Sequence, residues 1–223
     1  MQDVFQNERR KIDMETWERA TVFNFFKEFT EPYHSVCVRV ACTATYRHAK
    51  EHGFSVFLSL LHRALVAAQQ TDGFRTRIVD DEVWIYEQIH GGSAVGRPNG
   101  TIGFAHYRFH KTIEAFVTEA APEVERVRQR NDIERYPEPN LIRFSALPWL
   151  DFTSLSHARD FSRKDSAPLI TFGKITEADG VRTMPVSIHA HHALADGLHV
   201  AQFVQHFQEL LHAPDAIPTA GVG

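Results

Sequence analysis

The residue types that can do chemistry gather near the C-terminus of this chain. Residues 183–190 alternate between apolar and polar side chains, which predicts a strand, and the pair His191–His192 stands at its end. An amphipathic helix is predicted over 197–211, and Asp196 suits its N-cap position. A strand–turn–helix junction can hold an imidazole rigidly, and a neutral imidazole accepts a proton near pH 7. The junction therefore indicates a histidine general base.

Two other interpretations of these histidines stay open. The chain of 223 residues contains 14 histidines, so a histidine pair is also compatible with an ordinary surface or core position. His189 and His191 lie two residues apart on the predicted strand and share a face, which would allow them to bind zinc together. The sequence shows no third ligand at a suitable spacing, and we expect a protein without a metal.

The composition is that of an ordinary globular protein and argues against several other classes. Hydrophobic residues make up 43% of the chain and charged residues 23%, which does not fit a largely disordered protein. The net charge is −4, so no basic excess points to nucleic acid or to an anionic membrane as a partner. The length fits a single domain over residues 1–223, and we expect 1–12 and 213–223 to be peripheral or frayed.

The cysteines and the apolar segments predict the cellular compartment of the protein. Cys37 and Cys42 lie five residues apart in a strand-like run, so their side chains face opposite sides and cannot form a disulfide. Free thiols are typical of a reducing compartment. The polar start of the chain lacks the apolar core of a signal peptide, and the most apolar stretch, 54–68, is too short to span a bilayer. We expect a cytoplasmic protein.

The elements that must position the histidine pair are strands and helices in irregular order. Strands are predicted over 35–45, 101–109, 141–146 and 168–175, and a hairpin over 74–89 that turns at Asp80–Asp81. Helices are predicted over 14–29, 52–70 and 112–130, with Pro122 kinking or splitting the last one. The glycine-rich residues 91–100 lack the lysine of a phosphate-binding loop and are interpreted as a connection. Because strands and helices intermix without strict alternation, we expect an α/β fold with a mixed sheet and helices packed on it.

Several segments together resemble one enzyme family. Residues 191–197, which read HHALADG, fit the HHxxxDG pattern of chloramphenicol acetyltransferases, dihydrolipoyl acyltransferase cores and peptide-synthetase condensation domains. The further matching segments are 145–154 (SALPWLDFTS, similar to SxxPWxxFTS), 167–174 (APLITFGK, similar to a strand with the pattern AP, two apolar residues, then TxxK), and Trp17 to Arg19 with the aromatic residues of 23–26. These matches keep their order from 12 to 211, and the chain therefore resembles the chloramphenicol acetyltransferase family.

The resemblance implies a fold and an activity. It implies a trimeric sandwich of a mixed sheet and helices, with each active site between two subunits. The implied reaction transfers an acetyl group from acetyl-CoA to the primary hydroxyl of chloramphenicol, with both substrates bound together, and confers resistance to the drug. His192 would be the general base that takes the proton of the hydroxyl. Ser145 would donate a hydrogen bond to the tetrahedral oxyanion, and Thr171 would support that oxyanion through a water molecule.

The resemblance also implies roles for residues around the reacting atoms. Asp196 would pair with Arg19 in a structural ion pair, and Lys174 would lie near CoA. The acceptor pocket would be lined by the apolar side chains of Phe25, Phe26 and Ile102.

The chain departs from the family pattern at positions beside the reaction centre. His189 stands where a glutamine is usual, Phe26 where a tyrosine is usual, and Arg143 where a small polar residue is usual. These differences leave the base and the oxyanion donor in place and put the acceptor in question. Two alternatives therefore stay open, an acyltransferase with a different alcohol or thiol acceptor, and a non-catalytic trimeric protein that binds hydrophobic ligands.

Overall fold

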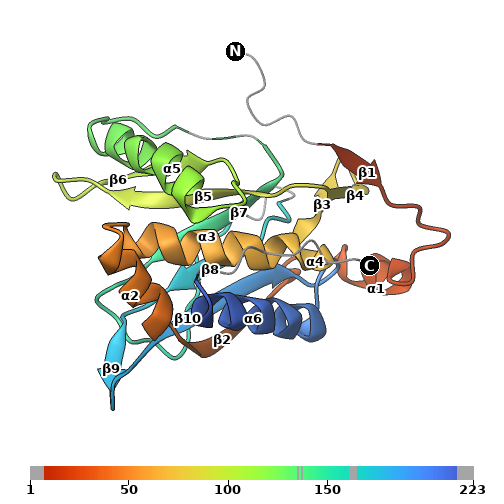
Figure 1. Cartoon of the computed structure of the whole chain (residues 1–223). Coiled ribbons are helices and arrows are strands. Elements are labelled where there is room, and N and C mark those ends of the chain that lie inside the picture. The colour runs from red at the N-terminus through yellow and green to blue at the C-terminus, as the bar shows by residue number, and fades with distance from the viewer. Residues whose placement is uncertain (1–7, 135, 137, 161–164, 215–223) are drawn as a thin grey trace.

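A computed structural model describes residues 8–134, 136, 138–160 and 165–214 of the chain, and Figure 1 shows its architecture. The strands are β1 (Arg9–Lys11), β2 (Tyr33–Ala41), β3 (Thr76–Val79), β4 (Glu82–Tyr86), β5 (His90–Gly96), β6 (Ile102–Tyr107), β7 (Leu141–Ala146), β8 (Leu169–Phe172), β9 (Thr176–Ala178) and β10 (Val181–His191). The helices are α1 (Ala20–Phe26), α2 (Thr43–Glu51), α3 (Val56–Gln69), α4 (Asp72–Arg75), α5 (Ile113–Arg128) and α6 (Gly197–His212).

The main sheet has seven strands of mixed direction. Its order is β2-β10-β8-β7-β5-β6, and the short β9 pairs with one end of β10. β10 is antiparallel to both β2 and β8, whereas β7 runs parallel to β8 and to β5. The expected α/β fold with a mixed sheet and packed helices is therefore confirmed.

Helices α2, α3, α5 and α6 cover one face of this sheet (Figure 1). Along β10, Val186, Ile188 and Ala190 point into the hydrophobic core beneath these helices. Helix α3 is buried almost throughout because it packs against α2, α5 and α6 as well as against the sheet. Since side chains alternate along a strand, Ser187 and His189 point to the opposite face, which these helices do not cover. We call that side of the sheet the open face.

A small second sheet and a second hydrophobic core, formed by Ile12, Phe23, Val83, Ala193 and Leu194, hold the first part of the chain. β1, β4 and β3 form this sheet, and β3 and β4 turn at Asp80 and Asp81, which both have positive φ, as the hairpin prediction requires. Of the terminal segments 1–12 and 213–223, which we expected to be peripheral or frayed, residues 1–7 and 215–223 lie outside the described residues. Arg9–Lys11 pair with β4, and Ile12 packs into the second core.

The interpretation of 91–100 as a connection is wrong, because His90–Gly96 form β5 in the interior of the main sheet. A Cβ atom on Gly91 would come within 3.2 Å of Leu61 and Leu65, so glycine here lets α3 approach the strand. Gly91 thus serves close packing, whereas Gly100, with a positive φ, lies in the turn that leads to β6. The strand predicted over 35–45 also ends earlier, at Ala41, and residues 43–51 form α2, which the sequence pattern did not predict.

Other predictions hold with small changes. The helix predicted over 112–130 is the single helix α5, which Pro122 does not split. Both cysteines, Cys37 and Cys42, are free thiols. Within the described ranges, every helix is too short or too polar to cross a lipid bilayer.

Candidate active site

His192 occupies the turn between β10 and α6, between two other rings. The ring of Phe26 stacks on it with centroids 3.9 Å apart and planes 15° apart, and the ring of His34 lies 4.6 Å away. His34 Nε2 donates a hydrogen bond to the carbonyl oxygen of Ala195 at 3.0 Å, because a carbonyl oxygen can only accept. Burial lowers the pKa of His34, so a neutral imidazole lies beside His192.

The backbone of this turn is held at several points. His192 N donates to the carbonyl oxygen of Pro32 at 2.7 Å, which joins the turn to the start of β2. Ala193 and Leu194 are buried in the second core, against Phe23 of α1. Nδ1 of His192 is buried and has no hydrogen-bond partner among the described residues, so proton exchange with an outside substrate has to use Nε2.

Arg19 and Asp196 form an ion pair next to the turn. Arg19 Nη1 donates to Asp196 Oδ2 at 2.6 Å, and the two side chains are 18% and 33% exposed. Asp196 caps α6, as predicted, because Oδ1 accepts from the backbone N–H of Leu198 at 3.0 Å. Burial disfavours the carboxylate, but hydrogen bonds from Arg19 and His199 outweigh this and hold the pKa of Asp196 well below its usual range.

Ser145 and Thr171 lie side by side on the open face. Ser145 of β7 pairs with Thr171 of β8, and Thr171 pairs in turn with Ser187 of β10. Thr171 is fully buried, and its Oγ1 lies 3.0 Å from Nε2 of His157. Lys174 follows two residues after the end of β8, is exposed, and is held by a hydrogen bond from its backbone N–H to Leu150.

Within one chain, His192 and Ser145 do not meet. His192 is five residues beyond Ser187 along β10, a distance of about 17 Å at ~3.3 Å per residue. Ser145 is two strands away from β10, about 10 Å at ~4.8 Å per strand. Phe25 and Phe26 lie on α1 near His192, whereas Ile102 is exposed on the outer edge strand β6. Within the chain, these candidate residues therefore do not form one cluster.

The two histidines considered for zinc have other partners. His189 Nε2 lies 3.0 Å from Ser187 Oγ, and its ring packs edge-on to the ring of His157. His191 packs its ring against Tyr33. The part of the chain that the structure describes contains no group of three or more histidine, cysteine or acidic side chains arranged to hold a metal ion.

Comparison with known proteins decides the family. The sequence profile of the family described as chloramphenicol acetyltransferase matches residues 8–208. This chain belongs to that family. A solved chloramphenicol acetyltransferase structure superposes on it with a TM-score of 0.85 and 30% identity, covering 92% of this chain and 100% of the other.

Curated members of the chloramphenicol acetyltransferase family agree along nearly their whole length. The chloramphenicol acetyltransferase of Bacillus pumilus is 25% identical over 211 residues, which is 92% of this chain and 94% of the relative. Chloramphenicol acetyltransferase 3 of Escherichia coli is 25% identical over 209 residues, 91% of this chain and 97% of the relative. The chain is therefore an acetyltransferase enzyme.

A more distant structure shares the fold alone. The dihydrolipoamide acetyltransferase of Azotobacter vinelandii superposes with a TM-score of 0.64 at 18% identity, covering 89% of this chain and 88% of the other. The two proteins therefore share the arrangement of sheet and helices.

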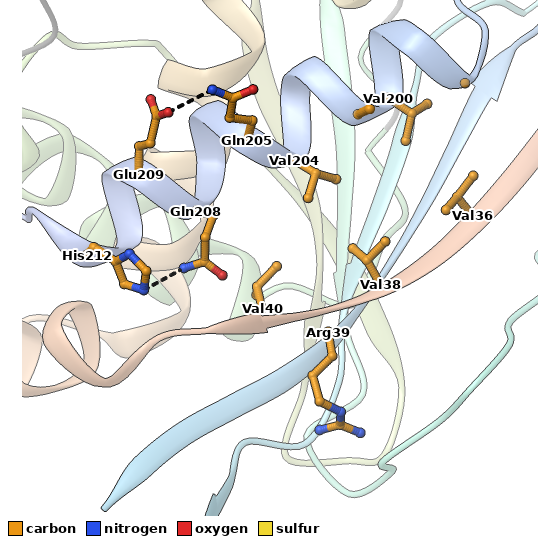
Figure 2. Close-up of a pocket in the computed structure, with 12 residues that line it drawn as sticks. Val36, Val38, Arg39, Val40, Val200, Val204, Gln205, Gln208, Glu209 and His212 are labelled. Carbon is orange, nitrogen blue, oxygen red and sulfur yellow. Dashed lines mark hydrogen bonds between the residues drawn. The ribbon is translucent and has the colours of Figure 1, made fainter.

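The acetyltransferase also has a groove away from these residues. Figure 2 shows it between α6 and β2, with a floor of Val36, Val38 and Val40 and a wall that includes Val200 and Val204. Its volume is about 500 Å³. None of the candidate catalytic residues lines this groove, because Ser145 and Thr171 point to the opposite face of the sheet.

Sequence reasoning missed three side chains of this acetyltransferase near the candidate residues, two of which contact them directly. His34 contacts His192, His157 contacts Thr171, and Arg159 places its guanidinium 3.3 Å from the ring centroid of Tyr33. His34 is the second residue of β2 and the other two lie in the irregular segment after β7, so neither periodicity nor a motif marks them. The one signal in the sequence for these three residues is that histidine and arginine side chains are abundant in the chain.

Proposed function

We propose that this acetyltransferase transfers the acetyl group of acetyl-CoA to the primary hydroxyl of chloramphenicol and so confers resistance to the drug. The observation that carries the proposal is the His192 ring, which Phe26 and His34 hold from two sides in a member of the chloramphenicol acetyltransferase family. Such fixed placement is what a general base requires. We also propose that the chain acts as one domain, and in the cytoplasm, where thiols stay reduced.

In this proposal His192 moves one proton in each direction. Its Nε2 accepts the proton of the acceptor hydroxyl while that oxygen attacks the thioester carbonyl carbon. The carbonyl π electrons move to oxygen and form a tetrahedral oxyanion. When the oxyanion collapses, the carbon–sulfur bond breaks, and the imidazolium returns the proton to the sulfur of CoA. Both substrates are bound together, so holding them in place lowers the barrier in addition to the base.

Ser145 and Thr171 have separate tasks at the oxyanion. Ser145 is half-buried, and its hydroxyl would donate directly to the developing negative oxygen. Thr171 is its register partner and is already within hydrogen-bond distance of His157, which supports an indirect role through a water molecule. The exposed ammonium group of Lys174 is suited to the negative charges of CoA.

We further propose a homotrimer in which His192 of one subunit faces Ser145 of the next. The separation of the two residues within one chain supports this arrangement, since the proposed reaction needs both at one carbonyl group. The exposed aromatic side chain of Phe25, which is 62% exposed, supports it too, because a neighbouring subunit or an acceptor would bury it. In this arrangement Phe25, Phe26 and Ile102 line the acceptor pocket.

A thiol-release assay tests the proposal. Purified protein is mixed with acetyl-CoA and chloramphenicol, and free CoA is followed with a thiol reagent while the acetylated drug is identified by mass spectrometry. We expect drug-dependent release of CoA. Release with other alcohols but not with chloramphenicol would remove the drug and keep the acetyl transfer, whereas binding of the drug without any release would identify a non-catalytic binder.

A further inference from the structure

A group of basic and imidazole side chains lies on the open face beside Thr171. His157 Nε2 is 3.0 Å from Oγ1 of Thr171, and the His157 ring packs edge-on to the ring of His189 at 5.0 Å. Arg159 stacks its guanidinium over the ring of Tyr33 at 3.3 Å. We call His157, Arg159 and His189 the basic cluster.

The basic cluster contains a buried donor without a partner. Nη2 of Arg159 is buried and has no hydrogen-bond partner among the described residues. Arg143 on the same face is different, because it donates to the carboxylate of Asp165, which also accepts from the backbone N–H of Ala167. A buried guanidinium N–H without a partner is costly, and an oxygen atom of a ligand would relieve that cost.

The charge of Arg159 acts on the imidazoles around it. Burial comes first and the positive charge of Arg159 second in lowering the pKa of His157. Burial also leads for His189 and His191, whose pKa values fall to about 4, with Arg159 again contributing. The basic cluster therefore combines the single positive charge of Arg159 with two neutral imidazoles, which is an environment that favours an anion.

The position of the basic cluster fits the acceptor and not CoA. Lys174 lies three residues after Thr171 along the chain, a distance of about 10 Å. In the opposite direction along the sheet, His189 lies about 7 Å from the level of Thr171, which pairs with Ser187. Tyr33, on whose ring Arg159 stacks, lies about 13 Å from that level. With CoA on the Lys174 side, as proposed above, the acceptor reaches the reaction centre from the side of the basic cluster.

We infer that the site, besides chloramphenicol, also takes alcohols that carry an anionic group and prefers them to their neutral analogues, with Arg159 binding that group while the hydroxyl lies at Ser145 and Thr171. The inference rests on the proposed acetyl transfer and names the acceptor class. A carboxylate suits Arg159 because a guanidinium donates two parallel hydrogen bonds to it. Neutral His157 and His189 lie beside it as additional hydrogen-bonding groups.

The test compares two alcohols that differ in one group. The first probe is para-(hydroxymethyl)phenylpropanoate, whose hydroxyl and carboxylate are separated by a distance comparable to that between Thr171 and Arg159. The second probe is its primary amide, and chloramphenicol is the third acceptor. CoA release is measured with each. We expect kcat/KM for the carboxylate to exceed that for the amide by about 10-fold or more, a factor that corresponds to one charge-assisted hydrogen bond. In Arg159→Gln this ratio should fall to within about twofold of one, and Arg159→Lys should restore part of it.

Arg39→Gln is the matched control, because it removes one positive charge from the same strand as Tyr33 but from a side chain that is paired with Asp151. This variant should keep the wild-type ratio. Equal rates for the two probes, or turnover of chloramphenicol alone, would overturn the inference and leave acetyl transfer standing. If none of the three alcohols releases CoA, the acetyl transfer itself fails and the inference fails with it.

Discussion

Arg19 and Asp196 are 177 positions apart in the chain, and Nη1 of the arginine lies 2.6 Å from Oδ2 of the aspartate. The pair joins the start of α1 to the start of α6. Between these two helices lies the turn that carries His192, and Phe26 at the end of α1 stacks on its ring. The ion pair thus holds the two elements that determine where the imidazole points.

Breaking this pair should lower activity without touching the reacting atoms. In Asp196→Asn or Arg19→Ala, small shifts of the His192 turn should reduce kcat/KM by about 10²-fold, since a displacement of ~1 Å can have that effect. The double variant should lose little more than either single one, because both changes remove the same interaction. Equal and additive losses would show that the two residues act separately. The measurement is CoA release with chloramphenicol.

His192→Ala tests the base itself. A positioned base contributes about 10²–10⁴-fold, so kcat should fall by at least ~10²-fold while the thermal unfolding temperature changes little. Turnover close to wild type would rule out His192 as the base. Alanine at His206, on α6 and away from the turn, is the control and should leave kcat near the wild-type value.

His34 should act as a positioning residue for His192. His34→Phe keeps a ring beside His192 but removes the hydrogen bond to Ala195 that ties β2 to the turn. We expect kcat to fall by about 5-fold with KM for chloramphenicol nearly unchanged, since one neutral hydrogen bond of ~1 kcal/mol is lost. His34→Ala, which also loses the ring contact, should fall further. An unchanged kcat in both variants would contradict the role.

The buried imidazoles should make the protein sensitive to acid. The folded pKa of His189 is about 4, below its ordinary value of ~6.5, so the stability from keeping the ring neutral is present above pH 6.5. It is lost as pH falls from 6.5 through 4, because the unfolded chain binds the proton first. The melting temperature of wild type should fall across this window, and that of His189→Gln should fall by a few °C less. Identical declines would show that His189 does not contribute.

A mixing experiment tests whether each site is shared between subunits. His192→Ala and Ser145→Ala are each expected to be nearly inactive alone. If chains exchange at random in mixed assemblies, about a quarter of the sites combine a native His192 from one chain with a native Ser145 from another. Co-expression of the two variants should therefore recover about a quarter of the wild-type activity. No recovery, in assemblies shown to contain both chains, would place the two residues in the same subunit.

Local patterns in the sequence were enough for the elements around the histidine pair. The alternation over 183–190, the N-cap Asp196 and the amphipathic pattern over 197–211 predict β10, the turn and α6. The reason is physical, because these features depend on side chains within one turn or one strand of each other. The hairpin at Asp80–Asp81 belongs to the same class.

Tertiary structure decided what local patterns leave open. His90–Gly96 form a strand because β6 and β7 pair with both of its edges and Gly91 lets α3 approach, and no sequence pattern reports such neighbours. The contacts of His34, His157 and Arg159 likewise depend on the register of strands far apart in the chain. Residue types and their local spacing determine that an imidazole stands at a turn. Only the packing of distant segments decides which rings, charges and hydroxyl groups surround it.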